Sequence, residues 1–357
     1  MKQGKNNKVL VAISGGVDSA MAAKLLIDQG YEVSGVHLRL WREDTPSNRK
    51  ESLEDSYRDA KNLCQELNIP FVSLDLANLF KQEIVDDFIK SYAQGLTPNP
   101  CVRCNKKIKI NYLWSYAQSQ GFDFLATGHY LKIMRDETGI KVFKALDKDK
   151  DQSYFLYALD KNLLKYLLFP LGSIKKIEVR NLAQSLDLDI AKKSDSQEIC
   201  FIAGKRHNDF LKKHLSLRPG DIRLWPSQEK IAQHQGLALY TIGQRRGIEI
   251  GGTGPYYAAK FDWDNNILYV VKNFSDSVLY QKEMIVRDFN WLEEVKLPSL
   301  LDVVIRYRHP AVKAQVDYSS SDKVLKVNFF EAQRAITPGQ SAVFYQGEQL
   351  LGGGIIG

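Results

Sequence analysis

A strand pattern followed at once by a glycine turn and a helix pattern is the feature that most constrains this chain. Residues 8–13, KVLVAI, form a continuous β-prone run, which is typical of a strand buried on both faces of a sheet. The turn SGGVDS begins at Ser14, and residues 19–30 then place apolar side chains four positions apart. We expect Gly30 to end a helix there. Strand, turn and helix in this order predict one unit of a parallel sheet.

The same alternation continues further along the chain. Strand patterns occupy residues 31–40, 71–77 and 122–129, and helix patterns occupy residues 53–68, 79–94 and 107–120. Helices that connect parallel strands cover both faces of the sheet. The predicted fold class of the N-terminal part is therefore α/β, with a parallel sheet and helices on both faces.

The turn SGGVDS lies where such a sheet binds its ligands, beyond the carboxyl end of a strand. Glycines let the backbone approach an anion closely, and Ser14 and Ser19 add hydroxyl donors at the start of a helix. The turn matches neither the Walker pattern, in which Gly-Lys precedes Ser or Thr, nor GxGxxG. We expect it to hold a phosphate or pyrophosphate, and the alternative is a tight turn without a ligand.

Two cysteines lie in the segment GLTPNPCVRCNKKIKI, residues 95–110. Cys101 and Cys104 precede a predicted basic helix that carries Lys106, Lys107 and Lys109, and a thiol beside cations at a helix N-terminus has a lowered pKa. We therefore expect reactive thiols in a proline-stiffened polar loop. Half of a zinc site and a pair of inert buried thiols are the alternatives, although no second CxxC or paired histidine accompanies this one.

The other two cysteines stand in apolar surroundings. Cys200 lies between Ile199 and Phe201, a setting that taken alone is typical of a core residue. Cys64 lies within the helical pattern NLCQEL, where we interpret it as structural. Four cysteines in a chain of this length are too few for a secreted disulfide framework.

Composition restricts the class of protein. With 357 residues and 44% hydrophobic content, the chain can bury more than one core, so we expect two or three domains. No apolar stretch reaches the roughly 18 residues of a membrane span, and the apolar run near the start is too short for a signal peptide. We expect a cytoplasmic protein without a membrane partner. The net charge of +7 favours a polyanionic partner such as nucleic acid.

After Cys200 the sequence changes to short β-prone runs divided by Gly, Pro and Asn-Asn turns. A break near residues 272–280 divides this part into two, which gives expected domains at 1–203, 204–273 and 274–357. Arg245 and Arg246 stand beside a turn, and the segment RYRH, residues 306–309, is expected to place arginines on one strand face and Tyr307 on the other. Arginine and tyrosine in this arrangement suit RNA recognition, and an ordinary polar strand edge is the alternative.

Several motifs together resemble one family. SGGVDS alone is similar to the signature of the PP-loop ATP pyrophosphatases, which use ATP to adenylate a carbonyl oxygen and release pyrophosphate. SGGVDS, TPNPCVRCN, ATGHY, KDQSYFL and SDSQEICFI, in this order, resemble the tRNA-specific 2-thiouridylases of the MnmA/TrmU family over nearly the whole chain. The resemblance implies an N-terminal PP-loop domain, a small central β domain and a C-terminal β-barrel.

The resemblance also implies a reaction. ATP, with Mg²⁺, would adenylate O2 of the wobble uridine of tRNA, which makes this a tRNA-uridine 2-sulfurtransferase that releases AMP and pyrophosphate. Cys200 matches the family's persulfide-carrying cysteine, and Cys104 matches the second catalytic thiol, which ends in a disulfide with Cys200. The implied partners are tRNAs for Glu, Gln and Lys and a sulfur donor such as a cysteine desulfurase or a sulfur-relay protein. A monomer is expected.

Site residues follow from the same motifs. The implied ATP-binding residues are Ala12, Ile13, Ser14, Gly15, Gly16, Val17, Asp18, Ser19, Leu38 and Gly128. The implied tRNA contacts are His129, Lys150, Asp151, Gln152, Arg306, Tyr307 and Gln340. Asn99, Pro100 and Cys101 would contact the target base, although many members have Asp where this chain has Cys101. No metal-ligand set within the protein is expected.

Two other functions remain as alternatives at this point. A PP-loop ligase of small molecules, similar to argininosuccinate synthase, would account for SGGVDS but would need neither cysteine. An RNA-binding adaptor that retains the ATP fold without its activity would account for the charge, although the intact motif and both cysteines argue against it.

Overall fold

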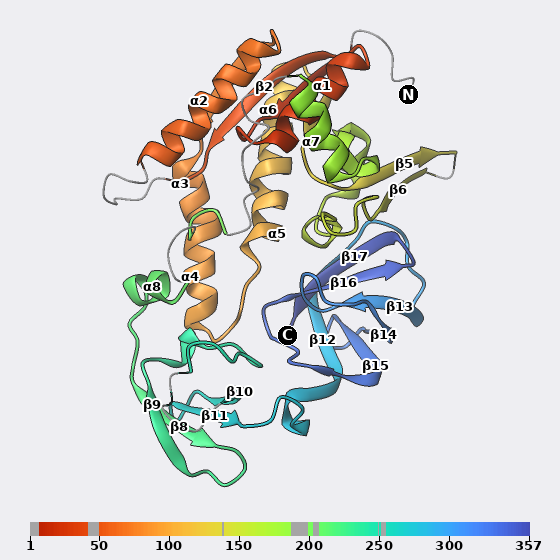
Figure 1. Cartoon of the computed structure of the whole chain (residues 1–357). Helices are drawn as coiled ribbons and strands as arrows, with labels where there is room; N and C mark the ends of the chain where they lie inside the picture. Colours follow the sequence, from red (N-terminus) through yellow and green to blue (C-terminus); the bar gives the residue numbers. More distant parts are fainter. Residues whose placement is uncertain are drawn as a thin grey trace.

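The computed structural model describes residues 7–41, 50–137, 139–186, 199–202, 207–248, 250 and 255–357. Figure 1 shows an α/β part at the top, a small β part at the lower left and a β-barrel at the lower right. The predicted fold class is confirmed. None of the helices in these residue ranges combines the length and the apolar character needed to cross a membrane. The expected domain boundaries stay a prediction, because residues 203–206 lie outside the described residues.

The N-terminal part contains a parallel sheet with the order β3-β2-β1-β4-β7. Its strands are β1 (Lys8–Ala12), β2 (Glu32–Arg39), β3 (Phe71–Asp75), β4 (Phe124–Thr127) and β7 (Leu167–Leu168). Strand β1 lies in the middle, and Val9, Leu10 and Val11 are all 0% exposed. The continuous apolar run at 8–13 is explained by this burial on both faces.

Helices cover both faces of the sheet. Val9 and Val11 pack in the same cluster as residues of α1 (Val17–Asp28), α2 (Lys50–Glu66) and α7 (Lys176–Ser185). Leu10 points the other way and packs with residues of α6 (Leu113–Ser119). Gly30 follows α1 with a φ of 86°, as expected of the glycine after a helix end.

Two helices that the sequence predicted as regular contain π-helical turns. The first consists of α3 (Ala77–Phe80), η2 (Lys81–Val85) and α4 (Asp86–Ala93), and the second of α5 (Pro100–Cys104), η3 (Asn105–Tyr112) and α6. The second helix begins at Pro100 rather than at residue 107, because proline is preorganised for the first turn of a helix. Both cysteines of CVRC are therefore helical.

The central part is a mixed sheet with the order β10-β11-β8-β9, in which only β8 and β11 are parallel among the described pairings. Its elements are α8 (His207–His214), β8 (Gly220–Leu224), β9 (Lys230–His234), β10 (Tyr257–Asp262) and β11 (Ile267–Val271). The prediction of all-β structure after Cys200 missed α8. This helix forms because Phe210 and Leu211 are buried in a cluster with residues of the N-terminal part.

The C-terminal part is a six-stranded antiparallel barrel, closed by the pairing of β12 with β17. Its strands are β12 (Tyr280–Trp291), β13 (Ser299–Val304), β14 (Val312–Ser319), β15 (Val324–Arg334), β16 (Ser341–Gln346) and β17 (Gln349–Ile356). The hairpin of β5 (Lys132–Asp136) and β6 (Gly139–Phe143) extends this sheet, because Gln349 pairs with Phe143 and Leu350 with Val142.

The short helices complete the element order. They are η4 (Ser153–Phe155), η5 (Lys161–Tyr166), η6 (Pro170–Ser173), η8 (Leu237–Leu239) and η9 (Ser277–Leu279).

The expected strand at residues 306–309 is wrong. Strand β13 ends at Val304, and the His309 N–H donates to the Arg306 carbonyl at 3.0 Å to close a turn. Arg308 adopts a φ of 61°, which a strand does not allow. His309 precedes Pro310, whose missing N–H removes a ladder donor, so the strand cannot continue through this position.

The barrel and the α/β part share one apolar core. Val343, Tyr345 and Leu350 of the barrel pack in the same cluster as Leu10 and residues of α6. The Asn290 Nδ2 of β12 donates to the carbonyls of Tyr157 and Leu159 at 2.8 and 2.9 Å. The two parts therefore form a common interior rather than a loose contact.

Replacing Asn290 with Ala should lower the free energy of unfolding by about 1–3 kcal/mol, because two carbonyls at this junction lose their donor. Asn265→Ala is the matched control, since Asn265 hydrogen-bonds only within an exposed turn as far as the described contacts show. Urea unfolding of both variants measures the difference. An Asn290 effect no larger than that of Asn265 would contradict a shared interior.

Candidate active site

The turn at residues 14–19 brings backbone N–H groups to the carboxyl edge of the sheet. Gly15 has a φ of 74°, and a Cβ there would lie 2.8 Å from the Ser56 carbonyl oxygen, so only glycine fits. Helix α1 begins at Val17 after Gly16, and no described side chain caps its N-terminus. A helix start of this kind presents N–H donors and a partial positive charge to an anion.

Ser19 shapes the turn from inside. Its hydroxyl donates to the Gly16 carbonyl at 2.9 Å and accepts from the Ser14 N–H at 3.1 Å. The two serine Oγ atoms are 3.3 Å apart. Because Ser19 is buried and its hydroxyl donates to the Gly16 carbonyl, its side chain stabilises the conformation of the turn.

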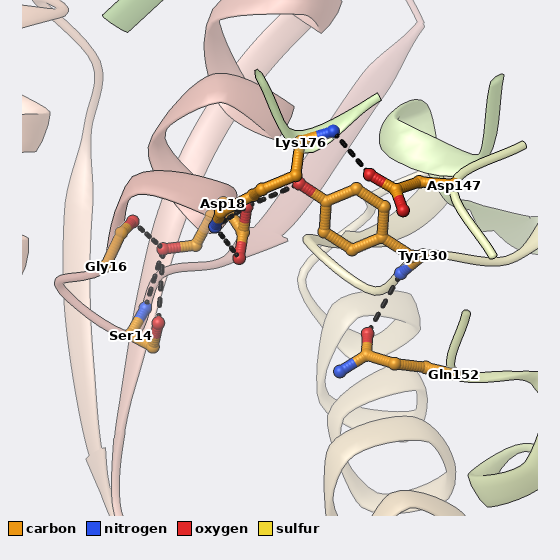
Figure 2. Close-up of polar contacts among 8 residues, drawn as sticks. Ser14, Gly16, Asp18, Tyr130, Asp147, Gln152 and Lys176 are labelled. Atoms are coloured by element: carbon orange, nitrogen blue, oxygen red, sulfur yellow. Dashed lines mark hydrogen bonds and ion pairs between the residues drawn. The ribbon is translucent and has the colours of Figure 1, made fainter. Parts of the chain in front are cut away.

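Asp18 is the centre of a polar network that the sequence did not predict (Figure 2). The Tyr130 hydroxyl donates to Asp18 Oδ1 at 2.7 Å, and the Lys176 Nζ lies 2.7 and 2.8 Å from the two carboxylate oxygens. The Lys176 backbone N–H donates to Asp147 at 2.8 Å, which ties the start of α7 to this site. Tyr130 stands in the quoted motif ATGHY, whereas Lys176 carried no local signal.

Gly128 and Leu38 lie at the ends of β4 and β2, the two strands that flank β1. A Cβ on Gly128 would lie 2.8 Å from the Asp18 carbonyl carbon and from the Ser19 nitrogen, so the backbone after β4 packs directly on the start of α1. Leu38 is half-buried near the end of β2 and pairs with Leu74 of β3. Both predicted nucleotide contacts are therefore at the same edge of the sheet as the turn.

The three candidate reactive cysteines gather in one place. Cys101 and Cys104 lie on α5, and Cys200 lies in a turn in which the Ile202 N–H donates to the Ile199 carbonyl at 2.9 Å. Both Cys101 and Cys104 influence the pKa of the Cys200 thiol electrostatically, so the three sulfurs are near one another. All are free thiols, and so is Cys64, which is fully buried as expected of a structural cysteine.

The expectation of thiols with lowered pKa is wrong. Burial raises the pKa of Cys101 and Cys104, and Cys104 is only 5% exposed rather than in a polar loop. Cys200 exposes surface to solvent, but desolvation by the protein around its thiol, with a smaller contribution from Cys104, raises its pKa to about 12. Lys109 opposes this at all three thiols by lowering each pKa. At Cys101 and Cys104 desolvation is stronger because α5 packs these two residues against the protein interior.

Phe201 fixes the turn that carries Cys200. Its ring contacts those of Phe80, Phe88 and Phe210 at centroid distances of 5.8, 5.2 and 5.5 Å. Phe201 is 1% exposed, so the residue beside the exposed Cys200 is an anchor in an aromatic cluster.

His129 has a charged neighbour, Lys109, in common with the thiols. It follows Gly128, and its Nδ1 lies 2.7 Å from the buried Thr127 hydroxyl. Desolvation, with a smaller contribution from Lys109, lowers the pKa of His129 to about 3. His129 is therefore neutral at physiological pH, and Lys109 lies near both this ring and the three sulfurs.

The predicted base contacts meet the barrel. Asn99 hydrogen-bonds the Tyr154 hydroxyl, which itself donates to the Ser341 carbonyl at 3.0 Å. The Gln340 amide donates to the Thr97 carbonyl at 3.1 Å. Barrel residues thus hold the segment that leads to Pro100 and Cys101.

The predicted tRNA contacts lie in different settings. Tyr307 is 36% exposed, and the centroid of its ring is 4.5 Å from that of Phe155, so two aromatic rings lie side by side. Arg306, the preceding residue, is exposed. Asp151 accepts hydrogen bonds from the Ala145 N–H and the Ser153 hydroxyl. Gln152 accepts one from the Tyr130 N–H at 2.9 Å, as Figure 2 shows. Lys150 is half-buried in the adjoining turn. Asp151 and Gln152 therefore also stabilise the loop.

The described residues contain no group of three or more His, Cys, Asp or Glu side chains that could hold a metal ion by themselves. Asp18 is the carboxylate at the turn that could supply one ligand, and phosphate oxygens are suitable companions for Mg²⁺.

The fold and the site define an α/β domain of the nucleotide-using class, followed by two β domains. Comparisons with protein families agree with this three-part division. The model of the tRNA methyl transferase HUP domain matches residues 7–204. The tRNA methyl transferase PRC-barrel domain matches residues 208–272, and the aminomethyltransferase beta-barrel domain matches residues 281–356.

Full-length relatives narrow this class. The chain is 38% identical to the tRNA-specific 2-thiouridylase MnmA of Oceanobacillus iheyensis over 359 residues, which cover 100% of this chain and 96% of the relative. It is 39% identical to that of Chlamydia pneumoniae, covering 98% and 96%, and 40% identical to that of Rickettsia massiliae, covering 99% and 97%. The chain belongs to the MnmA family of tRNA-specific 2-thiouridylases.

Alkylation by iodoacetamide should report the raised thiol pKa. Because the pKa of Cys200 is raised to about 12, its thiolate fraction should rise by about tenfold for each pH unit, so its alkylation rate should climb from pH 7 to pH 9 without a plateau. Lys109→Met should slow alkylation at Cys104 and Cys200, and Lys106→Met is the matched control. Mass spectrometry of each peptide gives the rates. A plateau below pH 8 would show a thiolate at neutral pH and contradict this account.

Phe201→Ala should cost about 3–5 kcal/mol of stability, because a fully buried ring is lost from the aromatic cluster. Phe330→Ala is the control, since Phe330 is 63% exposed on the barrel. Chemical denaturation measures both. Similar losses in the two variants would mean that Phe201 does not anchor the Cys200 turn.

Proposed function

We propose that this member of the tRNA 2-thiouridylase family uses ATP to adenylate O2 of the wobble uridine and then transfers persulfide sulfur from Cys200 to C2. The observation that supports this most directly is the continuity from the turn at residues 14–19 to the thiols. Gly128 packs on Asp18 and Ser19, His129 follows it, and Lys109 acts electrostatically on His129 and on the cysteines. A uridine activated at the turn would therefore be within the same site as the sulfur.

ATP would bind along the carboxyl edge of the sheet. The turn from Ala12 to Ser19 would hold the phosphates through N–H groups, and Leu38 and Gly128 would contact the nucleotide. Two observations support this: the backbone packs closely at Gly15 and Gly128, and no described side chain caps the start of α1. Asp18 would contribute to Mg²⁺ binding, and the ion would supply charge neutralisation for the polyphosphate.

Cys200 and Cys104 would have different roles in sulfur transfer. The terminal sulfur of a Cys200 persulfide forms the bond to C2, and AMP leaves with the former O2 oxygen. The Cys104 sulfur then attacks the Cys200 Sγ, which breaks the persulfide S–S bond and leaves the outer sulfur on C2. The product is 2-thiouridine and a disulfide of Cys104 with Cys200, which an external dithiol reduces by two electrons. The electrostatic effect of Cys104 on the Cys200 thiol, which places the two side chains near each other, supports this pairing.

Binding of tRNA would use the face formed by the barrel and the loop before α5. Asn99, Pro100 and Cys101 would contact the target base, and Arg306, Tyr307 and Gln340 would contact the RNA from the barrel. The exposed Tyr307 ring beside Phe155 offers a stacking surface of the kind that unpaired bases use. His129, which is neutral, would donate a hydrogen bond rather than a charge. Lys150, Asp151 and Gln152 would complete the contact.

We also propose the substrate tRNAs, the sulfur donor, the oligomeric state and the cellular location of the protein. The substrates are tRNAs for Glu, Gln and Lys, and the sulfur donor is a cysteine desulfurase or a sulfur-relay protein. The chain acts as a monomer in the cytoplasm.

The proposal is tested by incubating the protein with tRNA, ATP, Mg²⁺ and a persulfide donor and measuring wobble nucleosides by mass spectrometry. Wild type should form 2-thiouridine with AMP and pyrophosphate, and Cys200→Ser and Cys104→Ser should each lose it. Cys101→Ser, which alters only a proposed base contact, should lower thiolation without abolishing it, and Cys64→Ser is the control outside this site. Activity that survives in Cys104→Ser but not in Cys101→Ser would assign the second thiol to Cys101. Formation of ADP would contradict the adenylation step.

A further inference from the structure

Lys176 is a buried cation that contacts the nucleotide turn from a distant part of the chain. Its side chain is 8% exposed, and its Nζ lies 2.7 and 2.8 Å from the two Asp18 oxygens. Figure 2 shows the ammonium next to Asp18, within the same group as Ser14 and Gly16. Burying an ammonium carries a desolvation cost that one carboxylate offsets only in part. The contribution of this ion pair to stability therefore does not by itself explain why a lysine is buried here.

The turn itself supplies no cation. The motif SGGVDS, residues 14–19, contains N–H groups, two hydroxyls and one carboxylate, but neither Lys nor Arg. A nucleoside triphosphate carries several negative charges, and Asp18 adds another at the same place. Polyphosphate sites usually include a lysine as a point charge. The ammonium of Lys176 is in direct contact with this turn and has the charge that the turn lacks.

The surroundings fix the position of this ammonium. The Lys176 N–H donates to Asp147 at 2.8 Å and holds the first residue of α7 in place. The Tyr130 ring lies 6.0 Å from Nζ, and its hydroxyl binds the same Asp18 oxygen. Tyr130 is 2% exposed, so it orients the carboxylate from a rigid position. Preorganised charge of this kind binds a ligand without a large cost of ordering.

We infer that Lys176 is a further ATP-binding residue, which contacts the β- and γ-phosphates and the pyrophosphate product, and that Tyr130 is a positioning residue for Asp18. This rests on the proposed use of ATP at the turn. In adenylation the uridine O2 forms a bond to the α-phosphorus while the bond to the bridging oxygen breaks, and pyrophosphate leaves with the electron pair. The ammonium stabilises the negative charge that develops on that leaving group.

The direct test compares ATP with AMP, since only ATP carries the phosphates that Lys176 would contact. Lys176→Met should weaken ATP binding by about ten- to a hundredfold, the range expected for a lost charge-assisted hydrogen bond, and change AMP binding by less than about twofold. Lys175→Met is the matched control, because Lys175 is the exposed neighbour with the same charge. Calorimetric titration with Mg²⁺ present gives the dissociation constants.

A second background separates phosphate binding from simple pairing with Asp18. Asp18→Asn removes the charge that Lys176 neutralises, so the double variant Asp18→Asn with Lys176→Met contains no uncompensated carboxylate and keeps the test valid if Lys176→Met folds poorly. The loss of ATP affinity on adding Lys176→Met should persist in that background. If it disappears there, or if ATP and AMP lose affinity equally, Lys176 is only a structural partner of Asp18 and the inference is overturned.

The proposed function and this inference fail in different ways. A wild-type chain that binds no ATP would overturn both. A wild-type chain that binds ATP and forms pyrophosphate with tRNA, while Lys176→Met and Lys175→Met bind ATP equally, would overturn the inference and leave the proposed function intact.

Discussion

Burial of strand β1 on both faces is the constraint on which the site depends. Because Val9 and Val11 face one helical layer and Leu10 the other, the strand cannot shift along its neighbours without exposing apolar surface. Its end at Ala12 is therefore fixed relative to the ends of β2 and β4. The backbone contact of Gly128 with Asp18 and Ser19 follows from this alignment. The geometry of a turn that is only a few residues long is thus determined by the core beneath it.

The features that the sequence predicted correctly are those that depend on neighbouring residues. The strand at residues 8–13, the glycine turn after it and the α/β class are confirmed, because period and turn chemistry act over neighbouring residues. Lys176 could not be found in this way, since 158 positions separate it from Asp18 and nothing in the helix at 176–185 marks a nucleotide contact. Only the parallel sheet, which places α7 beside α1 as Figure 1 shows, brings the two together.

The errors have a common origin in tertiary packing. The thiols were expected to ionise easily because lysines follow them, but starting the helix at Pro100 turns Cys104 into the interior, where desolvation outweighs Lys109. The strand expected at residues 306–309 is a turn because Arg308 takes a positive φ, which alternation of residue types does not reveal. Helix α8 was missed because Phe210 finds its core in another domain.

The hairpin β5–β6 extends the barrel sheet and begins directly after the motif ATGHY, so backbone hydrogen bonds run from the nucleotide edge into the barrel. A shared core through Tyr345 and Leu350 reinforces this connection. Strand pairing and a shared core therefore fix the barrel against the α/β part. The spacing between the barrel surface and the turn at residues 14–19 is consequently a property of the fold itself, present before any partner binds.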